Sequence, residues 1–199
     1  SKALMNDMES IDEYIHPSEK ALAFGVYTAD LAYAAAYQDI ESTIGLYRIV
    51  KRLGSELHIE EMMTEEMMQQ VQSNMENPDS LALIAGDSYY QAVEYLERNG
   101  QEGKLALMSL GGWVESLHIT LHAIERFDAS SPEVTRVASQ KITFGNLYTY
   151  LKKNEEETGV KEEIKAIHLS VDDLKIAASI LFNAYVDDPL FVDIFQAEK

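Results

Sequence analysis

Three polar residues of one expected helix have the types and spacing that could do chemistry. Glu115, His118 and His122 stand at i, i+3 and i+7, so their side chains share one side of the helix, about 5 to 6 Å from neighbour to neighbour. Two imidazoles and a carboxylate can hold a transition metal. The same residues, with Arg126, also suit the polar face of a solvated helix. We favour the polar face and expect no metal; in the alternative, His118 and His122 are metal ligands.

Asp30 is the second candidate, because it is the one charged residue between Ala21 and Gln38. Tyr27 and Tyr33 stand about one helical turn to either side of it. A carboxylate in apolar surroundings needs hydrogen bonds or has a raised pKa. It is either part of a structural network with tyrosine hydroxyls or part of a pocket that holds a small ligand. The candidate ligand-binding residues are therefore Tyr27, Asp30, Tyr33, Trp113 and Glu115, and no catalytic residue or cofactor is predicted.

The stretch from Leu105 to Phe127 must position the first candidates, and its spacing predicts a helix packed on two sides. One face carries bulky apolar residues and a second face carries small ones. The small residues would let another helix backbone approach closely. Ala21 to Gln38 has a similar row of small residues, so it is expected to be a second buried helix.

The rest of the chain also has helical spacing, which predicts an all-α fold of seven to eight antiparallel helices in helix-pair or bundle packing around the central helix. A first helix is expected over Lys2–Tyr14, and helical spacing resumes over Lys161–Tyr185. We expect residues 1–199 to form a single domain. A weak echo between Leu22–Leu31 and Met108–Leu117 allows two related halves, about 1–100 and 101–199.

Composition excludes several classes of partner. With 16 basic against 34 acidic residues the formal net charge is −18, which repels nucleic acid and anionic membrane surfaces. No stretch has the roughly 20 apolar residues of a membrane span. Cysteine is absent, so disulfides and thiolate chemistry are excluded, while the redox compartment stays open. The sequence contains no phosphate-binding glycine loop, no Gly-x-Ser-x-Gly elbow, no His-Glu-x-x-His motif and no EF-hand spacing.

Two motifs carry a resemblance to a known family. They are Gly25-x-Tyr27-x-x-Asp30-Leu31-x-Tyr33, within Leu22–Ile59, and Gly111-Gly112-Trp113-Val114-Glu115, within Leu110–Leu121. These stretches resemble a family of uncharacterised all-helical proteins predicted as lipoproteins of Gram-negative gut-type bacteria. The resemblance implies a cell-envelope location, periplasmic or outer-membrane anchored, with a lipid-bearing cysteine upstream of Ser1. It implies no activity or ligand, and a cytoplasmic location stays open.

Three functions remain as hypotheses. The first is a non-enzymatic helical module of the bacterial envelope that binds a partner protein or a small ligand. The alternative is a metal- or carboxylate-dependent hydrolase that uses Glu115, His118 and His122, with Asp30 nearby if the two buried helices touch. The third is a structural subunit that assembles through an apolar patch such as Leu190, Phe191 and Phe195.

Overall fold

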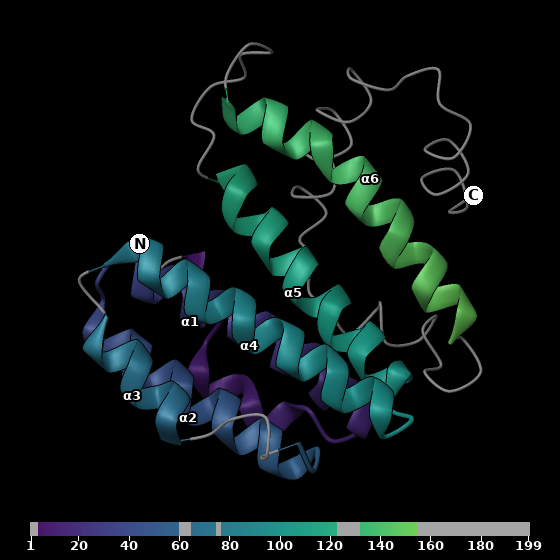
Figure 1. Ribbon diagram of the computed structural model, residues 1–199, viewed down its shortest axis with the longest axis horizontal. Coiled ribbons are helices and arrows are strands. Elements are labelled where there is room, and N and C mark those ends of the chain that lie inside the picture. The colour runs from purple at the N-terminus through teal and green to yellow at the C-terminus, as the bar shows by residue number, and fades with distance from the viewer. Residues whose placement is uncertain (1–3, 60–64, 75–76, 123–131, 155–199) are drawn as a thin grey trace.

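The computed structural model describes residues 4–59, 65–74, 77–122 and 132–154, and within these ranges it contains helices and no strand (Figure 1). The all-α prediction is confirmed, and the helices pack as in a bundle. The predicted helix over 161–185 and the patch at Leu190, Phe191 and Phe195 lie outside the described residues. In chain order the elements are a short 3-10 helix η2 (Met8–Glu13) and the α-helices α1 (Pro17–Ala36), α2 (Ile40–Glu56), α3 (Glu65–Ser73), α4 (Pro78–Arg98), α5 (Glu102–His122) and α6 (Pro132–Lys153).

The chain before α1 is not the helix that its spacing predicts. Its helical part is the 3-10 turn η2, whose first turn is capped by the Asp7 carboxylate, an acceptor for the Glu9 N–H at 2.9 Å. Pro17 then holds the preceding residue extended and takes the first position of α1. Residues 4–14, called the N-terminal strap below, therefore lie across the helices as a separate segment.

Helices α1 and α5 form the centre of the fold, and glycines bring their backbones together. A methyl group on Gly25 would overlap the carbonyl oxygen of Met108, and one on Gly111 would overlap that of Leu22. The expected close approach through small residues is thereby confirmed. Farther along both helices, Asp30 of α1 contacts Glu115 of α5, so α1 and α5 run in the same direction.

The two stretches of the sequence echo are the ones that meet at this contact. Gly25 of α1 faces the carbonyl group of Met108, three residues before Gly111 of α5. In the same way, Gly111 faces the carbonyl group of Leu22, three residues before Gly25. This reciprocity is what two related halves would produce. The duplication itself stays a prediction.

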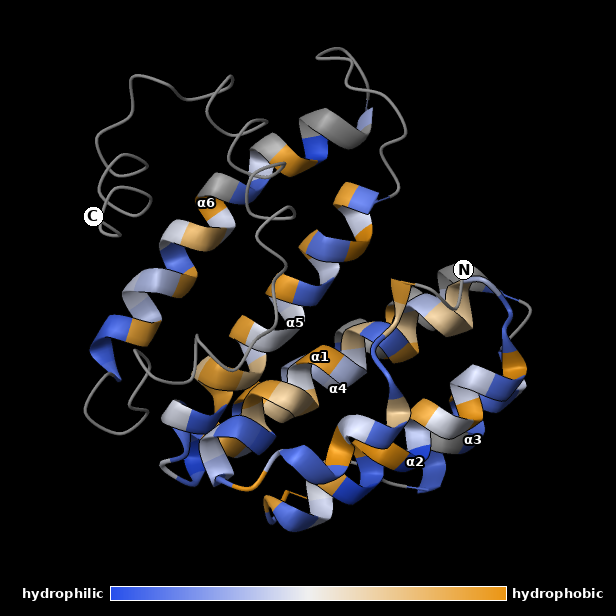
Figure 2. Cartoon of the chain, turned by 180° about the vertical axis from the view of Figure 1, so that it is seen from behind, coloured by the Kyte–Doolittle hydropathy of each residue, from blue (hydrophilic) through white to orange (hydrophobic). Residues whose placement is uncertain are grey.

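Apolar side chains form two clusters, and both include residues of α1. Figure 2 shows by colour where the hydrophobic residues lie along the helices. One cluster joins α1 to α4, α5 and α6 and includes Leu22, Leu96 and Leu110. The other joins α1 to α2 and to the strap, through Tyr27, Leu46 and Ile11 among others. In Figure 1, α6 lies beside α5 on the side away from α2. Among the described residues, no helix is both long and apolar enough to cross a membrane.

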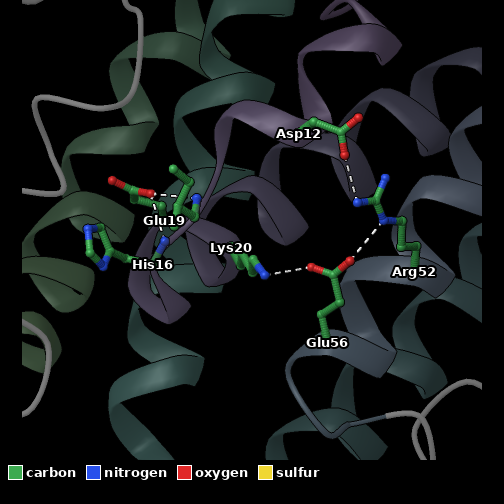
Figure 3. Close-up of polar contacts among 7 residues, drawn as sticks. Asp12, His16, Glu19, Lys20, Arg52 and Glu56 are labelled. Atoms are coloured by element: carbon green, nitrogen blue, oxygen red, sulfur yellow. Dashed lines mark hydrogen bonds and ion pairs between the residues drawn. The ribbon is translucent and has the colours of Figure 1, made fainter.

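Polar contacts tie the strap to the α1–α2 pair (Figure 3). Arg52 donates to Asp12 at 2.7 Å and to Glu56 at 2.8 Å, and Lys20 lies 2.7 Å from the other oxygen of Glu56. At the start of α1, the Glu19 carboxylate accepts the N–H groups of residues 15 and 16 at 2.8 and 2.9 Å. Solvent-exposed ion pairs contribute little stability, so their main effect is to set the path of the strap.

Candidate functional site

Asp30 and Glu115 meet between α1 and α5. Their side chains are in hydrogen-bond contact, and their exposed fractions are 0% and 6%. The parallel course of the two helices explains this, because both residues follow the glycine contact by a similar number of positions. Glu115 was expected on a solvated face, and that expectation is wrong. When a helix such as α5 is packed on two sides, its sequence does not show whether the third face is exposed. In this fold α1 covers the third face of α5 at Glu115.

Asn6 of the strap supplies the hydrogen bonds that Asp30 needs. The Oδ2 atom of Asp30 accepts the backbone N–H of Asn6 at 2.9 Å and its Nδ2–H at 3.1 Å. In the described part of the chain no amide or hydroxyl donor contacts the Oδ1 atom of Asp30, which is buried. Sequence reasoning missed Asn6, because it lies 24 positions from Asp30 and no local spacing connects the two.

Two carboxyl groups can form a hydrogen bond only if one of them carries a proton. Burial raises the pKa of Asp30, while the two bonds from Asn6, the contact with Glu115 and the charge of His118 act in the opposite direction. Asn6 stabilises the ionised form of Asp30, and a hydrogen bond from protonated Glu115 would do the same. Burial is the largest of these effects, so the pKa of Asp30 lies above its ordinary value.

The tyrosines lie beside the pair but do not bond to it in the expected way. Tyr27 is buried, and its hydroxyl donates to the backbone oxygen of Asp7 at 2.7 Å. Tyr14 packs edge-on to Tyr27, with ring centroids 6.4 Å apart. Burial raises the pKa of both hydroxyls, and the carboxylates of Glu13, Glu115 and Asp30 add to the effect on Tyr14. Tyr33 instead stacks on Tyr37 at 4.6 Å, outside this cluster.

The histidines are divided between the cluster and the surface. His118 is half-buried and close enough for its charge to influence Asp30, whereas His122 is exposed. Their rings lie 4.2 Å apart, and Nδ1 of His122 is 2.9 Å from the backbone oxygen of His118. Across the residues that the structure describes, no three His, Asp or Glu side chains are grouped as metal ligands.

Trp113, another candidate ligand-binding residue, lies in the contact between α5 and α6. Its indole N–H donates to Gln140 at 3.2 Å, and its ring centroid is 4.9 Å from that of Phe144. The structure therefore brings Tyr27, Asp30, Glu115 and His118 together, places Tyr33 and Trp113 elsewhere, and leaves His122 exposed beside His118.

Comparison of the chain with protein-family models, curated proteins and solved structures found no match. The resemblance to predicted envelope lipoproteins therefore stays a prediction.

An exposed surface at the start of α2 is the second notable feature. Tyr37, Ile40 and Ile44 are exposed by 67%, 58% and 42%, large fractions for apolar side chains. Arg48 and Lys51 are also exposed, and they follow Ile44 on α2 at helical spacing, four and seven residues later. We call these five residues the α2 outer face. It combines an apolar end with a basic end in a chain of net charge −18.

Proposed function

We propose that this chain is a non-enzymatic helical module of the bacterial envelope that binds a partner protein through the α2 outer face. The observation that carries the proposal is the exposure of three apolar side chains, Tyr37 just before α2 and Ile40 and Ile44 on α2, a helix whose opposite side is held in the core. Exposed apolar groups gathered at one place are typical of interaction sites, whereas single ones are ordinary. The buried carboxyl pair is enclosed, which favours a role within the fold over one toward a substrate.

Charge defines the kind of partner. Arg48 and Lys51 extend the apolar end of the face along α2 into a basic end. The complementary ligand is an amphipathic protein segment that places apolar side chains on Tyr37, Ile40 and Ile44 and carboxylates beside the two basic residues. The acidic remainder of the chain would repel such a segment elsewhere, so it helps to restrict binding to this face.

Site-specific photo-cross-linking in cells of the native organism tests this proposal. A benzophenone amino acid at position 44 should give one discrete protein adduct, and the same group at the exposed position 146 of α6 should not. Arg48→Glu combined with Lys51→Glu should reduce the adduct at least tenfold, whereas Arg98→Glu on α4 should not. An equal adduct at both positions, or no adduct at position 44, would contradict the proposal.

The envelope location rests on the resemblance stated above. Fractionation of cells that express the natural gene should place the protein with the periplasm or outer membrane. Recovery in the cytoplasmic fraction would remove the envelope from the proposal and leave the binding face untouched.

A carboxylate-dependent hydrolase is the second candidate, since a protonated and an ionised carboxyl group in contact are a pair that acid–base hydrolysis uses. A panel of ester, glycoside and peptide substrates tests it. Turnover by the purified chain that is lost in a folded Glu115→Gln variant would favour the hydrolase over the binding module.

A further inference from the structure

We propose that residues 187–195, called the acidic–apolar peptide below, bind the α2 outer face of the same molecule when no partner is bound there. This rests on the proposed function only in that both use the same face, and it adds a regulation, because the external partner must displace the peptide. The peptide, DDPLFVDIF, joins two adjacent carboxylates to a run that is apolar except for Asp193. It lies outside the described residues and includes the apolar patch at Leu190, Phe191 and Phe195, which the proposed function leaves unexplained.

The α2 outer face carries groups that the described fold does not use. Its basic residues, Arg48 and Lys51, are exposed and have no ion-pair partner among the described residues, whereas the neighbouring Arg52 is paired twice. Glu41 also borders the apolar end, but the two basic residues outnumber it. A ligand that combines carboxylates with apolar side chains is therefore the complement of this face.

The order of the groups along the two segments matches as well. On the α2 outer face the apolar residues come first and the basic residues follow, whereas in the peptide Asp187 and Asp188 come first and the apolar residues follow. An antiparallel arrangement therefore places the carboxylates beside the two basic residues and the apolar side chains beside Ile40 and Ile44. A parallel arrangement would set both charged ends against apolar groups, so charge determines the direction.

Charge and spacing also favour α2 over the other exposed apolar groups of the described helices. On α4, Leu83 and Tyr90 are each 72% exposed, but the exposed carboxylate of Asp87 lies between them and would repel an acidic peptide. On α6, the exposed Ile142 and Tyr148 are six positions apart, which places them about 120° apart around the helix. Of these three groups, the α2 outer face alone has apolar side chains that continue into basic ones.

The chain that leads to the peptide is long enough for an intramolecular contact. Residues 155–186 can extend to about 100 Å, whereas a compact domain of this size is about 40 Å wide. A segment tethered in the same molecule acts at an effective concentration of up to about 1 mM. A second copy of the chain would need a similar concentration to compete, which favours the contact within one molecule.

Photo-cross-linking in the purified full chain tests this contact. A benzophenone amino acid at position 44 should become joined to the acidic–apolar peptide of the same molecule, as read by mass spectrometry of the digested monomer. The same group at the exposed position 146 of α6 should not. The absence of a cross-link from position 44 to the peptide would overturn the proposal. A cross-link between two chains whose yield rises with protein concentration would also overturn it, in favour of a second copy as the occupant.

Charge reversal makes the test specific. Asp187→Lys combined with Asp188→Lys should reduce the internal cross-link about fivefold, because two ion pairs are lost. Adding Arg48→Glu and Lys51→Glu to that variant should restore the yield, because the charges of both partners are then exchanged. An unchanged yield in the first variant, or no recovery in the second, would contradict the contact.

A matched control lies in the same part of the sequence. Asp172→Lys combined with Asp173→Lys makes the same charge change outside the peptide, so it should keep the wild-type yield. An equal loss in this control would overturn the proposal, since the loss would then follow from net charge alone.

The internal contact and the proposed function can fail separately. A discrete partner adduct in cells without the internal cross-link in the purified chain would keep the binding function and overturn the internal contact. The internal cross-link without any partner adduct would keep the internal contact and overturn the binding function.

Discussion

Gly25→Ala should destabilise the fold strongly, although alanine is a better helix former than glycine. The added methyl group would overlap the carbonyl oxygen of Met108 and also approach the Gly112 nitrogen, and both atoms belong to the backbone of α5. Because helical backbone cannot turn aside, α1 and α5 must separate, which opens the packing around Ala21 and Ala106, both 0% exposed.

The magnitude follows from two opposing effects. Overpacking a core typically costs about 1 to 3 kcal/mol, and this overlap belongs at the upper end. Replacing glycine in a helix returns about 1 kcal/mol. The net loss in the free energy of unfolding should be about 2 kcal/mol, which for a chain of this size corresponds to a fall of about 4 to 8 °C in Tm.

Gly112→Ala is the matched control on the partner helix. A methyl group there would lie 3.4 Å from the Gly25 carbonyl oxygen, an ordinary contact, so the variant should equal or exceed the wild type in stability. Thermal and urea unfolding of the three proteins measure the difference. If Gly25→Ala proves as stable as Gly112→Ala, the reasoning about backbone contact between α1 and α5 is refuted.

Three other predictions concern single contacts. Gly145→Ala in α6, where an added methyl group meets nothing within 4 Å, should raise stability by about 1 kcal/mol in urea unfolding; a loss would contradict the open surroundings. Asn6→Ala should lower it by about 1 to 2 kcal/mol because Asp30 loses a donor, and an unchanged midpoint would argue against that bond. Unfolding followed against pH should show opposite trends. Because the pKa of Asp30 is raised, its contribution to stability is complete below its ordinary pKa of 3.8 and is lost as the pH rises through the folded value. The pKa of Glu19 is lowered by backbone N–H groups, and that of Glu56 by Lys20 and Arg52. The contributions of these two residues are therefore lost as the pH falls below 4.5. Asp30→Asn should abolish the first trend alone.

Helical periodicity was sufficient for the fold class, and small residues at helical spacing were sufficient to predict that α5 packs on two sides and that α1 is buried. The contact between Asp30 and Glu115 followed from the sequence only on the condition that these two helices touch. That condition depends on tertiary packing, which spacing within one helix does not contain.

The misplaced residues have related causes. Glu115 was assigned to solvent because a helix that is apolar on two sides gives no local sign of which neighbour covers the third. Tyr33 and Trp113 have the composition of a binding site, but Tyr33 stacks on Tyr37 and Trp113 packs against α6. Asn6 was missed because the strap is held by distant side chains, so its expected helical pattern did not determine its path.

The claim on which this description of the site depends is that Asp30 and Glu115 share one proton. Carboxyl ¹³C NMR of the wild-type chain, assigned with Asp30→Asn and Glu115→Gln, measures it directly. We expect one of the two resonances to report an ionised carboxylate and the other a protonated acid at pH 6, with a coupled change at higher pH. Two ionised carboxylates at pH 6, titrating independently at ordinary acidic pH, would contradict it.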